Sequence, residues 1–195
     1  MSATQQLRNE HEGIKMMFNI LEQMYQRFET TGDLNTDHFE DVLRFLRVFV
    51  DKCHRAKEEE LLFPALIAAG IPEDGPIGTM RYEHEVGKNH ATIMSEARVR
   101  YKRGDASWSK DLVRSAQIYI LLFRYHIEKE NNLIFLPADR LLSPEEQEGL
   151  LKGFRKIEAE QIGVGKHREF HALLKRLSGI YLDGWDWSTS KSGSV

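Results

Sequence analysis

Hydrophobic residues recur every three or four positions along four long stretches of the chain, which is the spacing of one face of an α-helix. The first stretch runs from about Thr4 to Glu29. Its inner face carries Leu7, His11, Ile14, Phe18, Leu21 and Tyr25. The other stretches cover about 36–64, 76–102 and 107–137. Alternating runs of β-branched residues are absent, so the pattern predicts an all-α fold, an antiparallel up-down four-helix bundle.

Capping residues, glycine and proline mark the expected ends of these helices. Asn35 offers an N-cap for the second helix. Pro64, followed by Gly70 and Gly75, is expected to close that helix, and Pro137 is expected to break the fourth. The reason is that proline lacks the amide hydrogen that a helix interior uses.

The residues after the fourth helix predict one or two extra C-terminal helices. The run Ser143-Pro144-Glu145-Glu146 has a cap, a proline at the first helical position and acidic residues in the first turn. A fifth helix should therefore extend to about Glu160, and a sixth should cover 166–177. We accordingly predict three parts: a four-helix bundle at 1–141, a helical extension packed on it at 142–184, and a flexible tail at 185–195.

Two of the predicted helices contain the same motif, His-x-x-Lys-Glu-x-x-Leu-x-Phe. It begins at His54 in the second helix and at His126 in the fourth. A separation of four residues places the His and Glu of each motif on one helical face, so an imidazole and a carboxylate can reach one point. We expect the Lys of the motif to lie on a neighbouring, outward face.

Two further histidines lie on the inner faces of the first and third helices. His11 precedes His54 by 43 residues, and His84 precedes His126 by 42. The chain therefore consists of two similar hairpins, each with one lone His and one His-x-x-x-Glu pair. Together they direct four imidazoles and two carboxylates into one core: His11, His54, Glu58, His84, His126 and Glu130.

Two carboxylates that face each other in an apolar core repel or bind protons unless a cation lies between them. Two metal ions bridged by Glu58 and Glu130, with the four histidines as terminal ligands, resolve this conflict. Imidazole and carboxylate in a bundle core suit iron, with manganese and zinc as competitors. Such a site leaves positions for a bridging solvent and a small exogenous molecule, for which Gly87 and Ala91 are small enough to leave room.

Each of these residues alone has a more ordinary interpretation. A single histidine on an inner face is usually a hydrogen-bonded structural residue, and His-x-x-x-Glu is a common surface ion pair. The coincidence of six such residues on four helices favours metal. Of the other histidines, His38 is expected to be exposed, His90 to lie on a different face, and His167 and His171 to lie on an exposed helix face. If the C-terminal extension covers one end of the bundle, Glu158, Glu160 or His167 is a candidate for contacting the metal ligands from outside; packing alone is the alternative.

The composition limits the partners and the kind of site. The net charge of −3 gives no electrostatic reason to expect nucleic acid or an anionic membrane. No apolar run approaches the roughly 18 residues of a membrane span. The single cysteine, Cys53, cannot form an intramolecular disulfide or a thiolate cage and is expected to be a packed residue. With a polar N-terminus unlike a secretory signal, we expect a cytoplasmic protein.

Residues from about Leu7 to Leu141 resemble the hemerythrin-like family, also called the HHE cation-binding domain. The resemblance rests on four motifs: His11-Glu12, His54 with Lys57-Glu58-Glu59 and Phe63-Pro64, Glu83-His84-Glu85, and His126 with Lys129-Glu130. It implies a four-helix bundle that holds two iron ions (Fe2+ or Fe3+) joined by an oxo or hydroxo bridge.

The resemblance also implies a function. Respiratory hemerythrins carry a histidine and an aspartate where this chain has Lys88 and Asn131. The ligand set instead resembles that of bacterial repair-of-iron-centres proteins. We expect reversible binding of dioxygen or nitric oxide for carriage, sensing or protection against oxidative and nitrosative stress. Two alternatives stay open. One is a di-iron oxidoreductase of peroxidase or nitric oxide reductase type that works with a redox partner. Tyr119 would then be a candidate donor, although an aromatic core residue is the more ordinary interpretation of it. The other is a donor of iron to apo-proteins.

Overall fold

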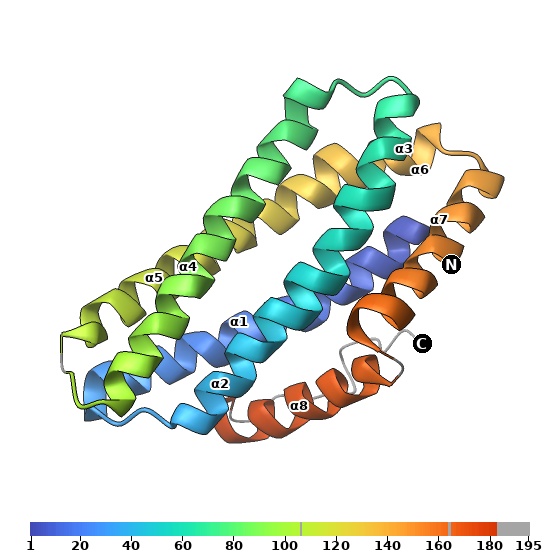
Figure 1. The fold of residues 1–195 in the computed structure, drawn as a ribbon. Helices are drawn as coiled ribbons and strands as arrows, with labels where there is room; N and C mark the ends of the chain where they lie inside the picture. Colours follow the sequence, from blue (N-terminus) through green and yellow to red (C-terminus); the bar gives the residue numbers. More distant parts are fainter. Residues whose placement is uncertain (106, 164, 183–195) are drawn as a thin grey trace.

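A computed structural model describes residues 1–105, 107–163 and 165–182. All regular structure in these ranges is helical, with no strand. Four long helices run antiparallel to their neighbours, and two shorter ones follow along one side of the bundle (Figure 1). This confirms the predicted fold class. Within the same ranges, no helix is long and apolar enough to cross a membrane. The predicted tail at 185–195 lies outside the described residues.

Several long helices are α-helical with π-helical segments inserted, which we label η. The first bundle helix is α1 (Ala3–Thr31). The second is continuous and comprises α2 (Thr36–Phe45), η1 (Leu46–Arg55), η2 (Glu58–Leu62) and α3 (Phe63–Ala68). The third comprises η3 (Glu73–Ile77), whose backbone is non-helical at Gly75, and α4 (Gly78–Lys102). The fourth comprises α5 (Trp108–Lys129), η4 (Glu130–Phe135) and α6 (Leu136–Leu141). The C-terminal part comprises α7 (Pro144–Ile157), η5 (Glu158–Ile162) and α8 (Lys166–Tyr181).

The predicted caps are present. The Asn35 side chain accepts hydrogen bonds from the backbone amides of Asp37 and His38. Ser143 and Glu146 form a reciprocal capping box at the start of α7. These side chains satisfy amides that the first turn of a helix leaves without partners, so they place the helix starts where the sequence indicates.

Gly70 ends the second helix as expected, since that helix runs to Ala68 and Gly70 has a positive φ of 95°. The expectation that Pro64 and Pro137 end their helices is wrong. Both helices continue past the proline, to Ala68 and to Leu141. Each proline follows a π-helical segment, η2 or η4. In a π-helical segment, each backbone amide bonds to the carbonyl five residues back instead of four, so the helix is locally wider. The hydrogen-bond pattern has therefore changed before the chain reaches the proline, which has no amide hydrogen to contribute.

The apolar core consists of two clusters at different heights in the bundle. The first cluster contains Leu7, near the N-terminus of α1, together with Phe63, Phe135 and, from α7, Phe154. The remainder of α1 belongs to the second cluster, together with residues of α8. The large members of this second cluster include Phe18, Phe45, Tyr119, Phe123 and Phe170. The extension therefore contributes to both clusters and packs against α1 (Figure 1).

Candidate metal centre

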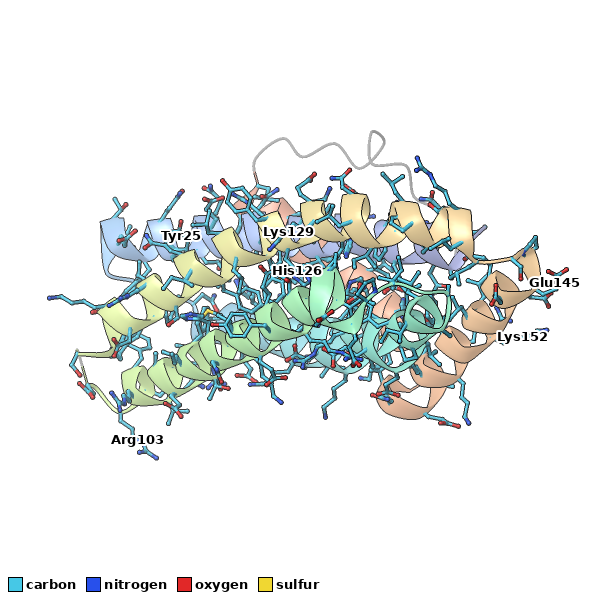
Figure 2. All side chains as sticks on the ribbon, turned by 90° about the horizontal axis from the view of Figure 1, so that it is seen from above. Tyr25, Arg103, His126, Lys129, Glu145 and Lys152 are labelled. Carbon is cyan, nitrogen blue, oxygen red and sulfur yellow. The ribbon has the colours of Figure 1, made fainter. Side chains whose placement is uncertain are left out.

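The six predicted site residues meet in the layer between the two apolar clusters. On α1, for example, His11 lies between Leu7 of one cluster and Ile14 of the other. His126 lies in the middle of the bundle between α5 and α4 (Figure 2). All six side chains are buried, and both glutamates are completely so. Four separate helices thus bring together the residues that the repeat singled out.

The four imidazoles form two pairs, one from each hairpin. The Nε2 atoms of His11 and His54 are 3.0 Å apart. The rings of His84 and His126 have centroids 4.6 Å apart. Each pair therefore consists of the lone histidine of a hairpin and the histidine of its His-x-x-x-Glu motif.

The two carboxylates lie between these pairs. One oxygen of Glu58 is 3.2 Å from Nε2 of His54, and its other oxygen is 3.5 Å from Nε2 of His84. One oxygen of Glu130 is 3.1 Å from Nε2 of His11, and its other oxygen is 3.2 Å from Nε2 of His126. Each glutamate therefore directs one oxygen toward each histidine pair, which is the arrangement a carboxylate needs to bridge two ions.

The donor set fits a pair of cations. All four carboxylate oxygens of Glu58 and Glu130 are buried, and none of them accepts a hydrogen bond from the part of the chain that the structure describes. Burying an ionised carboxylate without hydrogen bonds raises the free energy of the folded protein, unless the carboxylate is paired with a cation or coordinates a metal. The donor atoms fall into two groups, each within 4.8 Å, which share Glu130: His11, His54, Glu58 and Glu130 in one, and His84, His126 and Glu130 in the other.

Outer carboxylates orient three of the imidazoles. Glu10 lies 2.9 Å from Nδ1 of His54, and Glu83 lies 2.9 Å from Nδ1 of His126. Glu59 lies 2.7 Å from Nδ1 of His84. Each contact leaves the ring's Nε2 directed at the centre, as is usual for metal-bound histidines. Glu59 and Glu83 belong to the motifs of the family resemblance, but their contacts with the imidazoles were not predicted, and Glu10 was not singled out. Glu10 and Glu83 share a signal in the sequence, since each directly precedes a lone histidine.

The electrostatics of the metal-free centre favour positive charge. Burial opposes protonation of His54, but Glu58 and the hydrogen bond to Glu10 raise its pKa to about 10. Burial likewise opposes protonation of His126, but Glu130 and Glu83 raise its pKa to about 9. Metal ions compete with protons for the same nitrogen atoms. A divalent cation would therefore supply the charge that the carboxylates attract.

The expectation that the motif's lysine lies on an outward face is wrong for the first copy. The Lys57 side chain is completely buried, and its Nζ is 2.5 Å from Glu10 and 2.5 Å from Glu158. Lys129, at the equivalent position, is 34% exposed and pairs with Glu83. The difference arises because the C-terminal extension covers the first copy.

A small cavity and a larger groove adjoin the centre. Apolar residues line part of the inner cavity: Ile14, Val50, Phe123 and Ile127. Asp51 and Arg55 line both this cavity and a groove of about 550 Å³ at the surface. The expectation that Gly87 leaves room for a small molecule is wrong, because a Cβ at this position would lie 2.1 Å from the Phe123 ring. Ala91 does line the groove.

Gly87→Ala is expected to destabilise the protein by about 1–3 kcal/mol, because the Phe123 ring is packed on His126, with ring centroids 5.2 Å apart, and must shift. The matched control is Gly149→Ala in α7, where an added Cβ meets nothing within 4 Å. That change should be neutral or stabilise by up to about 1 kcal/mol. Urea unfolding of both variants checks this, and equal stabilities would contradict the close packing at Gly87.

The remaining sequence candidates lie outside the centre. Tyr119 is an aromatic core residue, and the centroids of the Tyr119 and Phe123 rings are 4.6 Å apart. Tyr119 does not line the inner cavity. The expectation that His38 is exposed is wrong, because it is partly buried and its Nδ1 is 2.9 Å from the Tyr181 hydroxyl. The expectation of an exposed face holds for His171. It is wrong for His167, which is half-buried near Cys53 and Glu158.

Comparison with known proteins agrees with this geometry over most of the chain. The family model of the hemerythrin HHE cation binding domain matches residues 2–136. That range contains all four bundle helices up to the first residue of α6, and therefore all six residues of the centre. No curated protein and no solved structure matches the chain.

Proposed function

The chain belongs to the hemerythrin HHE cation-binding domain family, and from this premise we propose that it is a non-haem di-iron protein that binds dioxygen or nitric oxide. The observation that carries the proposal is the placement of Glu58 and Glu130, each with one oxygen toward each histidine pair. In this proposal Glu58 and Glu130 would be shared by the two ions. His11 and His54 would hold one ion, and His84 and His126 would hold the other.

Iron is the metal that this proposal favours. Four imidazoles and two carboxylates in a bundle core match the ligand chemistry of non-haem iron, with manganese and zinc as competitors. A four-His, two-Glu set also resembles the repair-of-iron-centres type. Iron supplies redox chemistry toward small diatomic molecules, and six protein ligands shared by two ions leave positions open for one.

The protein's own residues would hold the ions and limit what reaches them. Glu10, Glu59 and Glu83 orient the imidazoles through Nδ1. The apolar wall formed by Ile14, Val50, Phe123 and Ile127 excludes water from one side of the centre. Asp51 and Arg55 lie between the surface groove and the inner cavity, since they line both, and in this proposal a small molecule would enter past these two side chains. This arrangement supports reversible binding, for carriage, sensing or protection against stress.

Binding is favoured here over turnover by the position of Tyr119. An oxidoreductase of the peroxidase type benefits from a donor beside the centre, whereas Tyr119 packs between Phe18 and Phe123 in the apolar core. The second alternative is a protein that donates iron to apo-proteins. It differs from gas binding and from an oxidoreductase because the iron leaves the protein.

One set of measurements tests the proposal. Protein expressed with iron should contain about two irons per chain, and well under two would contradict it. The reduced protein, mixed with air or nitric oxide in a stopped-flow spectrometer, should develop a long-lived charge-transfer band. Rapid decay with peroxide consumed would establish an enzyme instead. Loss of iron to a chelator or an apo-protein on the same time scale would establish a donor.

A further inference from the structure

Glu158 lies outside the family match and yet connects to the centre. It begins η5, in the C-terminal extension, and its side chain is 22% exposed. Its Oε1 is 2.5 Å from Nζ of Lys57 and accepts a hydrogen bond of 2.8 Å from Gln6. Glu158 therefore contacts a residue of each of two bundle helices, α1 and the helix that contains the first motif.

From Lys57 the contacts continue to the centre without a break. Lys57 donates to Oε1 of Glu10 over 2.5 Å, and Oε2 of Glu10 lies 2.9 Å from Nδ1 of His54. Both oxygens of Glu10 are thus engaged, one by the ammonium and one by the imidazole. A carboxylate held at both oxygens cannot rotate without breaking a charge-assisted hydrogen bond.

The second hairpin repeats this line of contacts but lacks its outer end. Lys129 pairs with Glu83, and Glu83 lies 2.9 Å from Nδ1 of His126. Among the described residues, no acidic side chain of the extension forms an ion pair with Lys129. Lys129 is 34% exposed, whereas Lys57 is completely buried. The internal repeat thus provides a comparison within one molecule: the same line of contacts, ended by Glu158 in one half and by solvent in the other.

We infer that Glu158 is a positioning residue for the His11/His54 half of the centre. It acts through Lys57 and Glu10 and makes this half more rigid than the His84/His126 half. The inference rests on the proposed function, since it concerns how the ions are held. It assigns a role to the extension: η5 completes the outer contacts of one half of the centre.

The physical reason is the burial of Lys57. A buried ammonium needs acceptors for its hydrogen bonds, and here two carboxylates supply them. With Glu158 neutralised, Lys57 keeps only Glu10 as a charged partner. The ammonium is then free to recruit water or to turn, and either change loosens the contact between Glu10 and His54.

Glu158→Gln tests the inference, with Glu160→Gln as its matched control. Glu160 lies on the same turn, but it is 65% exposed, and within the described residues its one ion pair is with Lys156, at 4.0 Å. In iron-loaded Glu158→Gln, one of the two irons should pass to a chelator about 3- to 10-fold faster. This is less than the roughly 10- to 100-fold effect of removing a direct outer contact of a metal ligand, because Glu158 acts through Lys57 and Glu10. One of two ⁵⁷Fe Mössbauer doublets should shift. Glu160→Gln should match the wild type in both.

A double variant separates positioning from general stability. If Glu158 acts through Lys57, the variant K57M/E158Q should release iron at the same rate as K57M alone. Additive effects, or identical behaviour of Glu158→Gln and Glu160→Gln, would overturn the inference. The failure of the proposed function would look different, because the wild type itself would then lack two irons per chain.

Discussion

Glu130→Ala is expected to remove most of the metal from the protein and most of the stabilisation that metal provides. Glu130 belongs to both donor groups, so its loss affects both ions. A metal that binds only the folded state at about 1,000 times its Kd adds about 4 kcal/mol of stability, which is about 8–16 °C in Tm for a chain of this size. Iron should therefore raise the Tm of Glu130→Ala by much less than it raises the Tm of the wild type.

The measurement compares each variant with and without iron, so that the cost of the cavity left by the side chain cancels. Metal content by elemental analysis and Tm by calorimetry are the two readouts. Glu128→Ala is the matched control, because Glu128 is exposed on the same helix and this variant should keep both the metal and the rise in Tm with iron. Full metal content and an unchanged rise in Tm with iron in Glu130→Ala would refute a bridging role.

Lys57→Met is expected to cause a large loss of stability, even in the metal-free protein. Lys57 is completely buried against Glu10 and Glu158, and removing one partner of a buried ion pair leaves the other charges uncompensated. Such losses are about 3–5 kcal/mol, or about 6–20 °C in Tm at this chain length. Urea unfolding of the chelator-treated protein measures the cost without the metal.

The repeat supplies the control for this prediction. Lys129→Met makes the same chemical change at the equivalent position, where the lysine is 34% exposed and pairs with Glu83. Glu83 is 12% exposed, so this pair lies between a buried pair and a surface pair, which contributes about 0–1 kcal/mol. Lys129→Met should therefore cause a clearly smaller loss than Lys57→Met. Equal losses in the two variants would mean that burial by the extension does not distinguish the two lysines.

The repeated motif made the histidines and glutamates of the centre predictable. Their spacing is local, and a separation of four along a helix determines which side chains share a face. The lone histidines, His11 and His84, were found by the same logic, because each lies on an apolar stripe at a matching distance from a motif. The structure brings all six residues into one buried layer.

Other parts of the site could not be predicted in this way. Spacing placed Lys57 and Lys129 in equivalent positions, but it does not show what packs over them. The contacts of Glu59 with His84 and of Glu158 with Lys57 join residues 25 and 101 positions apart. The continuation of two helices through Pro64 and Pro137 depends on π-helical segments that no residue pattern marked.

Helical period and repetition alone therefore determined the class of fold, the two hairpins and the residues with the chemistry to hold metal, since these depend on neighbours within a few turns. Only the tertiary structure decided how those residues pair, which oxygen of each glutamate faces which histidine, and which half of the centre the extension covers. These depend on how separate helices pack, because a side chain's burial and charged partners are set by distant segments of the chain.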